Sequence, residues 1–227
     1  MKLPYSFAGA LAALCLSALD SHGSVIVAFN NVNVPIPDGS LTPVVVGVDV
    51  AVPLTKITGL QVHLTLEPYG NAPAYNGDLF VSLTYSTGYA VLLNRAGHDM
   101  TNPFGYADSG FDITLAEGAP NVHTYQQTTG PTGSSPLTGT WAPDGRAVNP
   151  DEVATSDAVT ATLASFDGLD PNGHWTLALA DLEQGYQAQL KNWSLEITGV
   201  PEPQRWPLVV SLSLAGLGGW RWLRRHG

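Results

Sequence analysis

Two runs of alternating residues near the end of the chain constrain its fold more than any other feature. In residues 173–181 apolar side chains alternate with Thr and Ala, and a similar period recurs in residues 185–199. A period of two residues is typical of strands with one buried face. The second run shifts its phase around Lys191-Asn192, which predicts a bulge. We therefore expect a terminal hairpin whose apolar face is covered by the preceding chain.

The preceding residues, from 24 onward, have the composition of an all-β domain and turn-forming residues at regular intervals. The chain contains 24 Gly and 17 Pro, and only 12% of its residues are charged, which favours short strands joined by turns. Asn76-Gly77 predicts a tight turn, and residues 124–136 predict an exposed loop. Further strands are predicted at residues 25–29, 44–52, 57–66, 79–85, 89–94, 111–115, 137–141 and 159–166. This pattern indicates a two-sheet sandwich at residues 24–199.

Acidic residues outnumber basic ones in this body. The sequence has 19 Asp and Glu residues and a formal net charge of -10. Of these acids, 17 lie between residues 24 and 200, where the basic residues are Lys56, Arg95, Arg146 and Lys191. The region therefore carries a net charge of about −13, which repels phosphates and anionic lipids. This excludes nucleic acid as a partner and makes a cation a reasonable one.

The first 23 residues have the features of a secretory signal peptide. Lys2 provides a positive start, residues 7–19 are apolar, and small residues precede a cleavage site near Gly23. The single cysteine, Cys15, lies within this segment. We therefore expect export of a mature chain that has no disulfide and depends on its core for stability.

Four segments of the body occur in an order that resembles a known module. They are residues 57–62, 75–83, 173–181 and 190–195. In this order they resemble the P domain (P/Homo B), which follows the catalytic domain in proprotein convertases and many bacterial subtilisin-like proteases. The resemblance covers about residues 44–199. It implies a jelly-roll sandwich of the P-domain or galactose-binding-like kind.

The end of the chain, residues 200–227, resembles the PEP-CTERM sorting signal of Gram-negative bacteria that make extracellular polysaccharide. Its motif is Val200-Pro201-Glu202-Pro203, followed by an apolar stretch and a basic stop at Arg221, Arg224 and Arg225. In such a signal the apolar stretch enters the membrane as a helix and the basic residues stay in the cytoplasm. The resemblance implies processing by an exosortase and a protein of the cell envelope, the cell surface or the secreted fraction. An ordinary membrane anchor is the alternative.

The sequence shows no motif for catalysis. P domains elsewhere accompany serine endopeptidases, whose triad needs a base His, an orienting Asp and a nucleophilic Ser. The body contains neither a Gly-x-Ser-x-Gly motif nor a His-Glu-x-x-His zinc motif. Its histidines are His63, His98, His123 and His174. We therefore expect that the protein is not an enzyme.

Two acidic residues are candidate calcium ligands. Asp78 follows the Asn76-Gly77 turn and Asp181 ends a predicted strand. Loops at strand ends cluster at the edges of a jelly roll, where carboxylates can converge on an oxygen-ligated cation. The P-domain resemblance also implies calcium near such loops. The alternative is that both residues stabilise turns, as Asp often does.

Aromatic residues suggest a carbohydrate-binding site as another possibility. Trp175 and Trp193 alternate in phase with Leu residues, so we expect both in the core. The candidates for an exposed surface are Tyr75, Tyr89, Tyr106, Tyr125 and Tyr186.

These features predict a non-catalytic exported protein, a structural or interaction module of the envelope or the extracellular matrix. Extracellular polysaccharide is one expected partner. The alternatives are an accessory P domain that stabilises or targets a separate subtilisin-like protease, and a carbohydrate-binding module.

Overall fold

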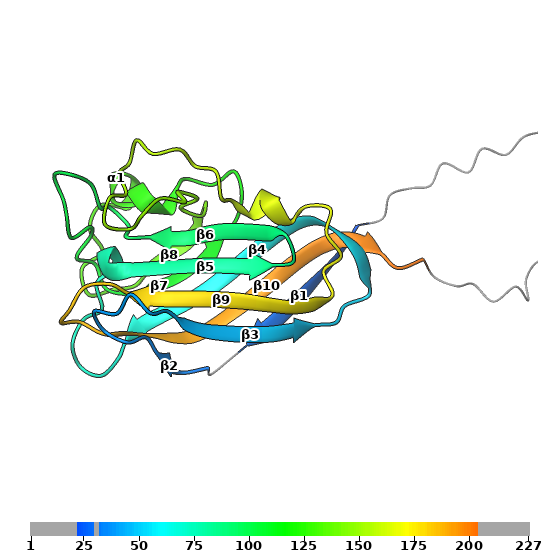
Figure 1. The fold of residues 1–227 in the computed structure, drawn as a ribbon, viewed down its shortest axis with the longest axis horizontal. Coiled ribbons are helices and arrows are strands. Elements are labelled where there is room, and N and C mark those ends of the chain that lie inside the picture. Colours follow the sequence, from blue (N-terminus) through cyan, green and yellow to red (C-terminus); the bar gives the residue numbers. More distant parts are fainter. Residues whose placement is uncertain (1–21, 30–31, 204–227) are drawn as a thin grey trace, which may run out of the picture.

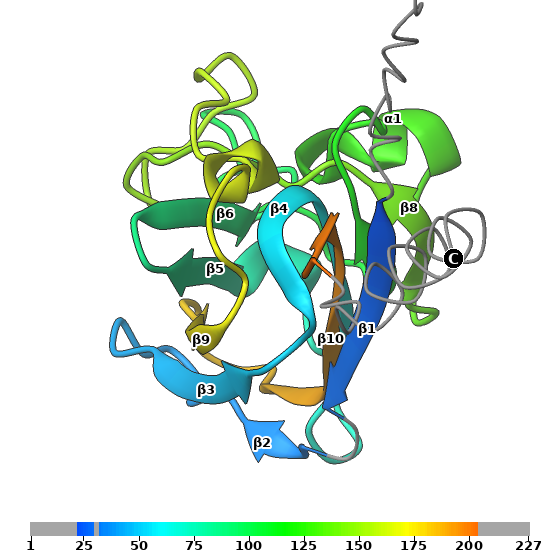
Figure 2. The same cartoon turned by 90° about the vertical axis from the view of Figure 1, so that its right-hand side faces the viewer.

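The computed structural model describes residues 22–29 and 32–203, which form two packed β-sheets (Figures 1 and 2). The first sheet contains, in order, β1 (Gly23–Phe29), β10 (Ala188–Pro201), β4 (Leu54–Pro68), β7 (Phe111–Leu115) and β8 (Leu137–Trp141), with β2 (Val34–Pro35) paired to β10. The second contains β3 (Val44–Val50), β9 (Gly173–Asp181), β5 (Leu79–Tyr85) and β6 (Gly88–Asn94). Strands β7 and β8 run parallel, and the other pairs are antiparallel. The prediction of an all-β sandwich is confirmed.

The core fills the space between the two sheets. In β9 the side chains of Trp175, Leu177 and Leu179 are fully buried, as their alternation predicts. Trp193 in β10 is 1% exposed. The ring of Trp175 stacks on Tyr85 with centroids 4.2 Å apart, and its Nε1 donates a hydrogen bond to Pro171 O at 2.9 Å. Both tryptophans are therefore core residues and do not form a sugar-binding surface.

The predicted terminal hairpin is wrong, because β9 and β10 lie in different sheets. Strand β9 pairs with β3 and β5, whereas β10 pairs with β1 and β4. An alternating pattern identifies the buried face of a strand but carries no information about its neighbours in the sheet. The bulge predicted in the second run is confirmed, since the register of β10 against β4 shifts between Leu190 and Asn192.

Other local predictions have mixed outcomes. The strands predicted at residues 79–85 and 89–94 are confirmed as β5 and β6, and they pair as an antiparallel hairpin. The strand predicted at residues 159–166 is wrong, because Leu163–Phe166 forms a 3-10 helix. Its two buried residues, Leu163 and Phe166, are three positions apart, which is the spacing of one 3-10 turn.

The Asn76-Gly77 pair lies in a tight turn, as predicted, closed by a hydrogen bond from Asp78 N to Tyr75 O at 3.2 Å, but the turn does not connect two strands of a hairpin. The pair begins a buried 3-10 helix, Asn76–Asp78, directly before β5. Gly77 packs against backbone atoms of Phe104 and Gly105, where a Cβ atom would collide. The predicted loop 124–136 contains helix α1 (Gln126–Thr129) and begins near the fully buried Tyr125. In both places long-range packing determines the local structure, which a short sequence window does not reveal.

Both ends of the described chain lie at the same end of the sandwich. Gly23 in β1 pairs with Gly199 in β10, and the two strands leave the sandwich on the right of Figure 1. The opposite end contains the start of β3, the start of β5 and the connection from β9 to β10. Across the described ranges, no helix is long and apolar enough to cross a membrane.

Replacing Trp175 tests the core. Trp175→Ala removes a fully buried ring and leaves a cavity, so we expect the free energy of unfolding to fall by about 3–5 kcal/mol. Urea unfolding measures this change. Tyr89→Ala is the control because Tyr89 is 40% exposed; its expected loss is below about 1 kcal/mol. Equal losses for the two variants would contradict this description of the core.

Candidate functional site

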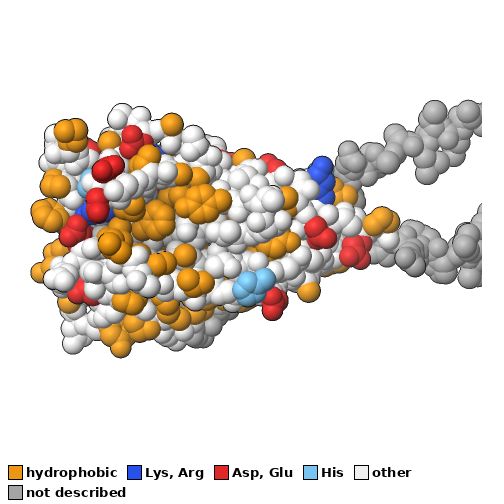
Figure 3. All heavy atoms as spheres, viewed as in Figure 1, with side chains coloured by type: hydrophobic (Ala, Val, Ile, Leu, Met, Phe, Trp, Pro, Cys, Tyr) orange, Lys and Arg blue, Asp and Glu red, His pale blue; other side chains and the backbone are white. Residues whose placement is uncertain are grey.

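A pocket of about 310 Å³ opens at the end of the sandwich opposite the chain ends. It is lined by carboxylates, aromatic rings and an amide: Tyr75, Asp78, Phe104, Glu183, Gln184 and Tyr186. We call it the acidic pocket. Figure 3 shows acidic side chains gathered around a basic one at this end, beside hydrophobic side chains. A second pocket of about 250 Å³, near Leu60 and Leu163, has no aromatic lining.

The 3-10 helix Asn76–Asp78, directly before β5, places Asp78 in the acidic pocket. The backbone on both sides is held, because Gly77 N donates to Tyr106 O at 2.9 Å and Leu182 N donates to Asp78 O at 2.8 Å. The side chain is only 4% exposed. Within the described part of the chain, no residue donates a hydrogen bond to its carboxylate. Asp78 is thus a buried acid that lines a cavity and has no hydrogen-bond partner there.

Asp181, the last residue of β9, lies beside this pocket and between the two sheets. It pairs with Leu79 of β5, and its Oδ2 accepts a hydrogen bond from Ala188 N, at the start of β10, at 3.1 Å. The side chain is fully buried, and Oδ1 has no partner among the residues that the structure describes. The carboxylate therefore connects the two sheets at the point where the chain crosses between them.

Burial changes the ionisation of both acids. It is the main cause that raises the pKa of Asp78 to about 7; Arg95 opposes the rise, and the charges of Glu183 and Asp38 add to it. Burial also raises the pKa of Asp181 to about 7, against the effect of the Ala188 N–H, and the charge of Asp78 adds to this rise. The two acids are thus partly protonated near neutral pH.

Arg95 is the buried cation beside the acidic pocket. Its side chain is 2% exposed, and its Nη2 lies 2.7 Å from Glu183 Oε1. Nη1 lies 3.3 Å from Asp151 Oδ1, and Nε donates to Gly77 O at 3.1 Å. Since Nη2 also donates to Pro103 O, most donors of the guanidinium are engaged away from Asp78.

Aromatic rings form the apolar part of the pocket. The rings of Tyr75 and Tyr186 are 4.5 Å apart at a tilt of 46°. Burial and a hydrogen bond with Tyr186 raise the pKa of Tyr75. Phe104 is 67% exposed. The pocket therefore presents carbon surface beside an unpartnered acid.

The structure brings together the two predicted calcium ligands, Asp78 and Asp181, at one end of the second sheet. Their oxygen atoms are of the kind that calcium prefers, but calcium takes about six to eight oxygen ligands. Within residues 22–29 and 32–203 there is no cluster of three His, Cys, Asp or Glu side chains that could hold a metal. The pair alone supplies too few donors, and calcium binding here stays a prediction.

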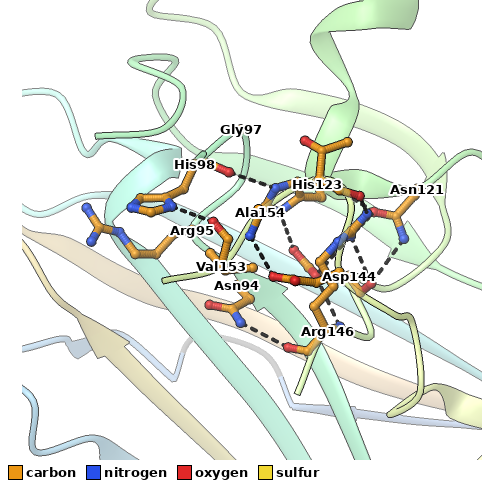
Figure 4. Close-up of polar contacts among 12 residues, drawn as sticks. Asn94, Arg95, Gly97, His98, Asn121, His123, Asp144, Arg146, Val153 and Ala154 are labelled. Carbon is orange, nitrogen blue, oxygen red and sulfur yellow. Dashed lines mark hydrogen bonds and ion pairs between the residues drawn. The ribbon is translucent and has the colours of Figure 1, made fainter. Parts of the chain in front are cut away.

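A second buried polar cluster surrounds His123 (Figure 4). Its Nδ1 lies 2.7 Å from Asp144 Oδ2, and its Nε2 lies 3.1 Å from the backbone oxygen of His98. Arg146 Nη1 lies 3.2 Å from the other oxygen of Asp144. His123 and Asp144 are both fully buried. Because both ring nitrogens face oxygen acceptors, His123 has no nitrogen available as a base toward a substrate, and the cluster holds loops together.

The predicted sorting motif begins within the last two pairs of β10. Val200 is 40% exposed, Pro201 pairs with Leu54 of β4, and Glu202 N donates to Pro53 O at 3.1 Å. The side chains of Glu202 and Pro203 are exposed. The basic stop at Arg221, Arg224 and Arg225 lies outside the described residues, as do residues 1–21 of the predicted signal peptide.

The five candidate surface tyrosines do not form one surface. Tyr75 and Tyr186 meet in the acidic pocket. Tyr125 is fully buried and donates to Asp108 Oδ2 at 2.7 Å, so its prediction as exposed is wrong. The sequence does not predict that Glu183 lines the acidic pocket or that Arg95 lies beside it, because no local pattern links residues so far apart in the chain.

The His123 cluster gives a test of buried charge. Asp144→Ala leaves Arg146 buried without its carboxylate partner, so we expect a loss of about 3–5 kcal/mol in unfolding free energy. Asp49→Ala is the control, because the ion pair between Asp49 and His174 is exposed and contributes about 0–1 kcal/mol. Urea unfolding compares the two variants. Similar small losses for both would show that the cluster does not stabilise the fold.

Asp181 gives a pH-dependent test. Because the pKa of Asp181 is raised in the folded state, its ionisation lowers the free energy of unfolding. This free energy is highest below the unfolded pKa of about 4 and falls as the pH rises toward the folded pKa of about 7. Asn resembles the protonated carboxyl group and cannot ionise. We therefore expect Asp181→Asn to be more stable than the parent at about pH 8, by on the order of 4 kcal/mol, and similar to it at about pH 4, below which both states of the parent are protonated. Thermal unfolding at both pH values measures the difference; a shift independent of pH would contradict the buried ionisation.

Comparisons with known proteins give only distant structural similarity. The sequence matches no family model and no curated protein. The sandwich is similar to a crystal structure of the Aeromonas sobria serine protease in complex with its chaperone, with a TM-score of 0.42 and 16% identity over 79% of this chain and 27% of that chain. A structure titled as the serine protease of Aeromonas sobria gives a TM-score of 0.41 and 17% identity over 80% of this chain and 28% of that chain. The chain thus spans little more than a quarter of the length of these structures.

Proposed function

We propose that this protein is a non-catalytic exported interaction module, a jelly-roll sandwich of the P-domain kind that is sorted to the cell envelope by its C-terminal signal. An exosortase recognises Val200-Pro201-Glu202-Pro203 and processes the chain there. The mature sandwich then acts at the surface or in the extracellular matrix through the loops at its other end.

The observation that carries this proposal is the position of the chain ends. Gly23 and Gly199 are paired neighbours at one end of the sandwich, and the acidic pocket lies at the opposite end. Cleavage near Gly23 and after β10 therefore removes transport segments without cutting a core strand. It also leaves the pocket facing away from the processing site.

The local geometry of the motif supports its role as a recognition sequence. Val200 and Pro201 extend β10, and the following backbone is held to Pro53 O through Glu202 N. Proline restricts the backbone on both sides of Glu202, whose side chain is exposed. The motif therefore offers an extended, pre-ordered segment to a processing enzyme, which lowers the entropy cost of binding.

The absence of catalysis in this proposal rests on the engagement of His123. Its ring is enclosed between Asp144 and the backbone of His98, with no route to a substrate because it is fully buried. The other described histidines with ion-pair contacts, His63 and His174, lie in strands and face exposed aspartates. None of these arrangements places a base beside a nucleophile.

The C-terminus of the mature protein tests the sorting proposal. Intact-mass measurement of the protein from wild-type cells is expected to show loss of about residues 1–23 and of the segment after the motif, while exosortase-deficient cells retain the C-terminal segment. Glu202→Ala changes an exposed motif residue and is expected to block processing; Glu196→Ala, within β10 and outside the motif, is the control. An identical C-terminus in the two strains would contradict the proposal.

A further inference from the structure

We propose that the acidic pocket binds an organic ammonium group, with the cation beside Asp78 and its carbon framework against the aromatic rings. The inference deepens the proposed role as an interaction module and names the chemistry of its ligand. It does not depend on how the C-terminus is sorted. A free amine, an amino sugar and a lysine side chain share this chemistry.

The first argument is the unsatisfied acid. Asp78 is 4% exposed and lines the pocket, yet none of the residues in the described ranges donates a hydrogen bond to its carboxylate. The Asp78 oxygens are not among the fully enclosed polar atoms that lack a partner in the described chain, so they reach the open pocket, where a charge-assisted hydrogen bond to an ammonium group can form. The ligand that fits this wall of the pocket is therefore a cation with N–H donors.

The second argument is that Arg95, the buried cation beside the pocket, donates no hydrogen bond to the Asp78 carboxylate. Arg95 uses Nη2 for Glu183 and Nη1 for Asp151. The acidic groups that act on Asp78 from the surrounding elements are Glu183, in the β9–β10 connection, and Asp38, before β3. Asp78 in turn acts on Asp181. With one arginine among these acids, the end of the sandwich keeps an excess of negative charge that favours a positive ligand.

The third argument is the carbon surface of the pocket. Tyr75 and Tyr186 form a ring pair, and Phe104 is 67% exposed beside them. Aromatic faces attract cations within about 6 Å and also pack against carbon chains. A bare metal ion gains little from such walls, since calcium prefers a shell of oxygen atoms. The combination favours a cation carried on carbon.

Binding is expected to depend on pH through Asp78. Its carboxyl has a raised pKa of about 7 because it is buried, an effect that Arg95 partly opposes. An alkylammonium ion stays protonated through this range, because amines of the lysine type have a pKa of about 10.4. The pocket therefore gains its charge as pH rises from about 5 to 8 while the ligand keeps its own. Affinity is expected to be at least about tenfold higher at pH 8 than at pH 5.

The test is a titration of the full chain with n-butylammonium in EDTA, followed by amide chemical shifts in NMR spectra, which detect millimolar affinities. We expect shifts confined to the pocket residues at about pH 8. Butanol, the neutral analogue, should produce much weaker shifts. Shifts of equal size from butanol, or none from the amine, would overturn the proposal.

Two variants separate binding from folding. Asp78→Asn has nearly the same shape, removes the charge and breaks no hydrogen bond of the described chain, so it should fold and lose about tenfold or more in affinity. Asp112→Asn, on an exposed face of β7, is the matched control and should bind like the parent. Tyr186→Ala should weaken binding through loss of the ring. Normal binding by Asp78→Asn would overturn the assignment.

Further probes identify the source of the ammonium group. Glucosamine represents an amino sugar and Nα-acetyl-lysine amide represents a protein side chain; tighter binding of either than of n-butylammonium supports the proposal and names the source. N-acetylglucosamine, which lacks the charge, should fail. Pocket shifts with millimolar calcium but none with any amine would overturn the proposal in favour of a metal site. Asp78→Asn should still be processed at its C-terminus, so failure here is distinct from failure of the sorting proposal.

Discussion

The burial of one face of each sheet against the other is the interaction on which the rest of the molecule depends. Trp175 from one sheet and Trp193 from the other are almost completely enclosed, and the chain has no cysteine in its described part to supplement this contact. Because the packing of the two sheets fixes the position of each strand, it also fixes where the strands end. The positions of Asp78 directly before β5 and Asp181 at the end of β9 follow from that arrangement.

The same arrangement buries two acids, Asp78 and Asp181, at one end of the second sheet. Asp181 continues the inward-facing positions of β9, so its carboxylate lies where the sheets meet and bonds to the start of β10. Asp78 directly precedes Leu79, the residue that pairs with Asp181, and its backbone oxygen accepts from Leu182 N at the same end of the sheet. The burial of the two acids raises the free energy of the charged forms, and the neighbouring acids add to it. Ionising these two carboxyl groups therefore lowers the stability of the fold, and Asp78 does so next to an open cavity that a ligand can enter.

The sequence predicts the faces of the strands much better than their partners. The alternation around Trp175 correctly gives the buried face of β9, because a period of two depends only on local geometry. It gives no information on sheet membership, and the predicted hairpin of β9 and β10 is therefore wrong. Asp78 and Asp181 are recognisable as acids at strand ends. The contact of Arg95 with Glu183 joins residues 88 positions apart, and no spacing in the sequence indicates it.

Because β10 lies between two other strands of its sheet, its hydrogen bonds determine how the domain resists a mechanical force applied at its C-terminal end. Residues 193–199 of the strand pair with β1 on one side, and the strand pairs with β4 from Ala188 to Pro201 on the other. Tension applied at Pro203 against the opposite end of the sandwich acts along the strand axis, so the hydrogen bonds on both sides of β10 resist it together, in shear. Opening them one by one would need a pull across the strand. A sandwich held from this end is therefore suited to withstand mechanical stress without unravelling.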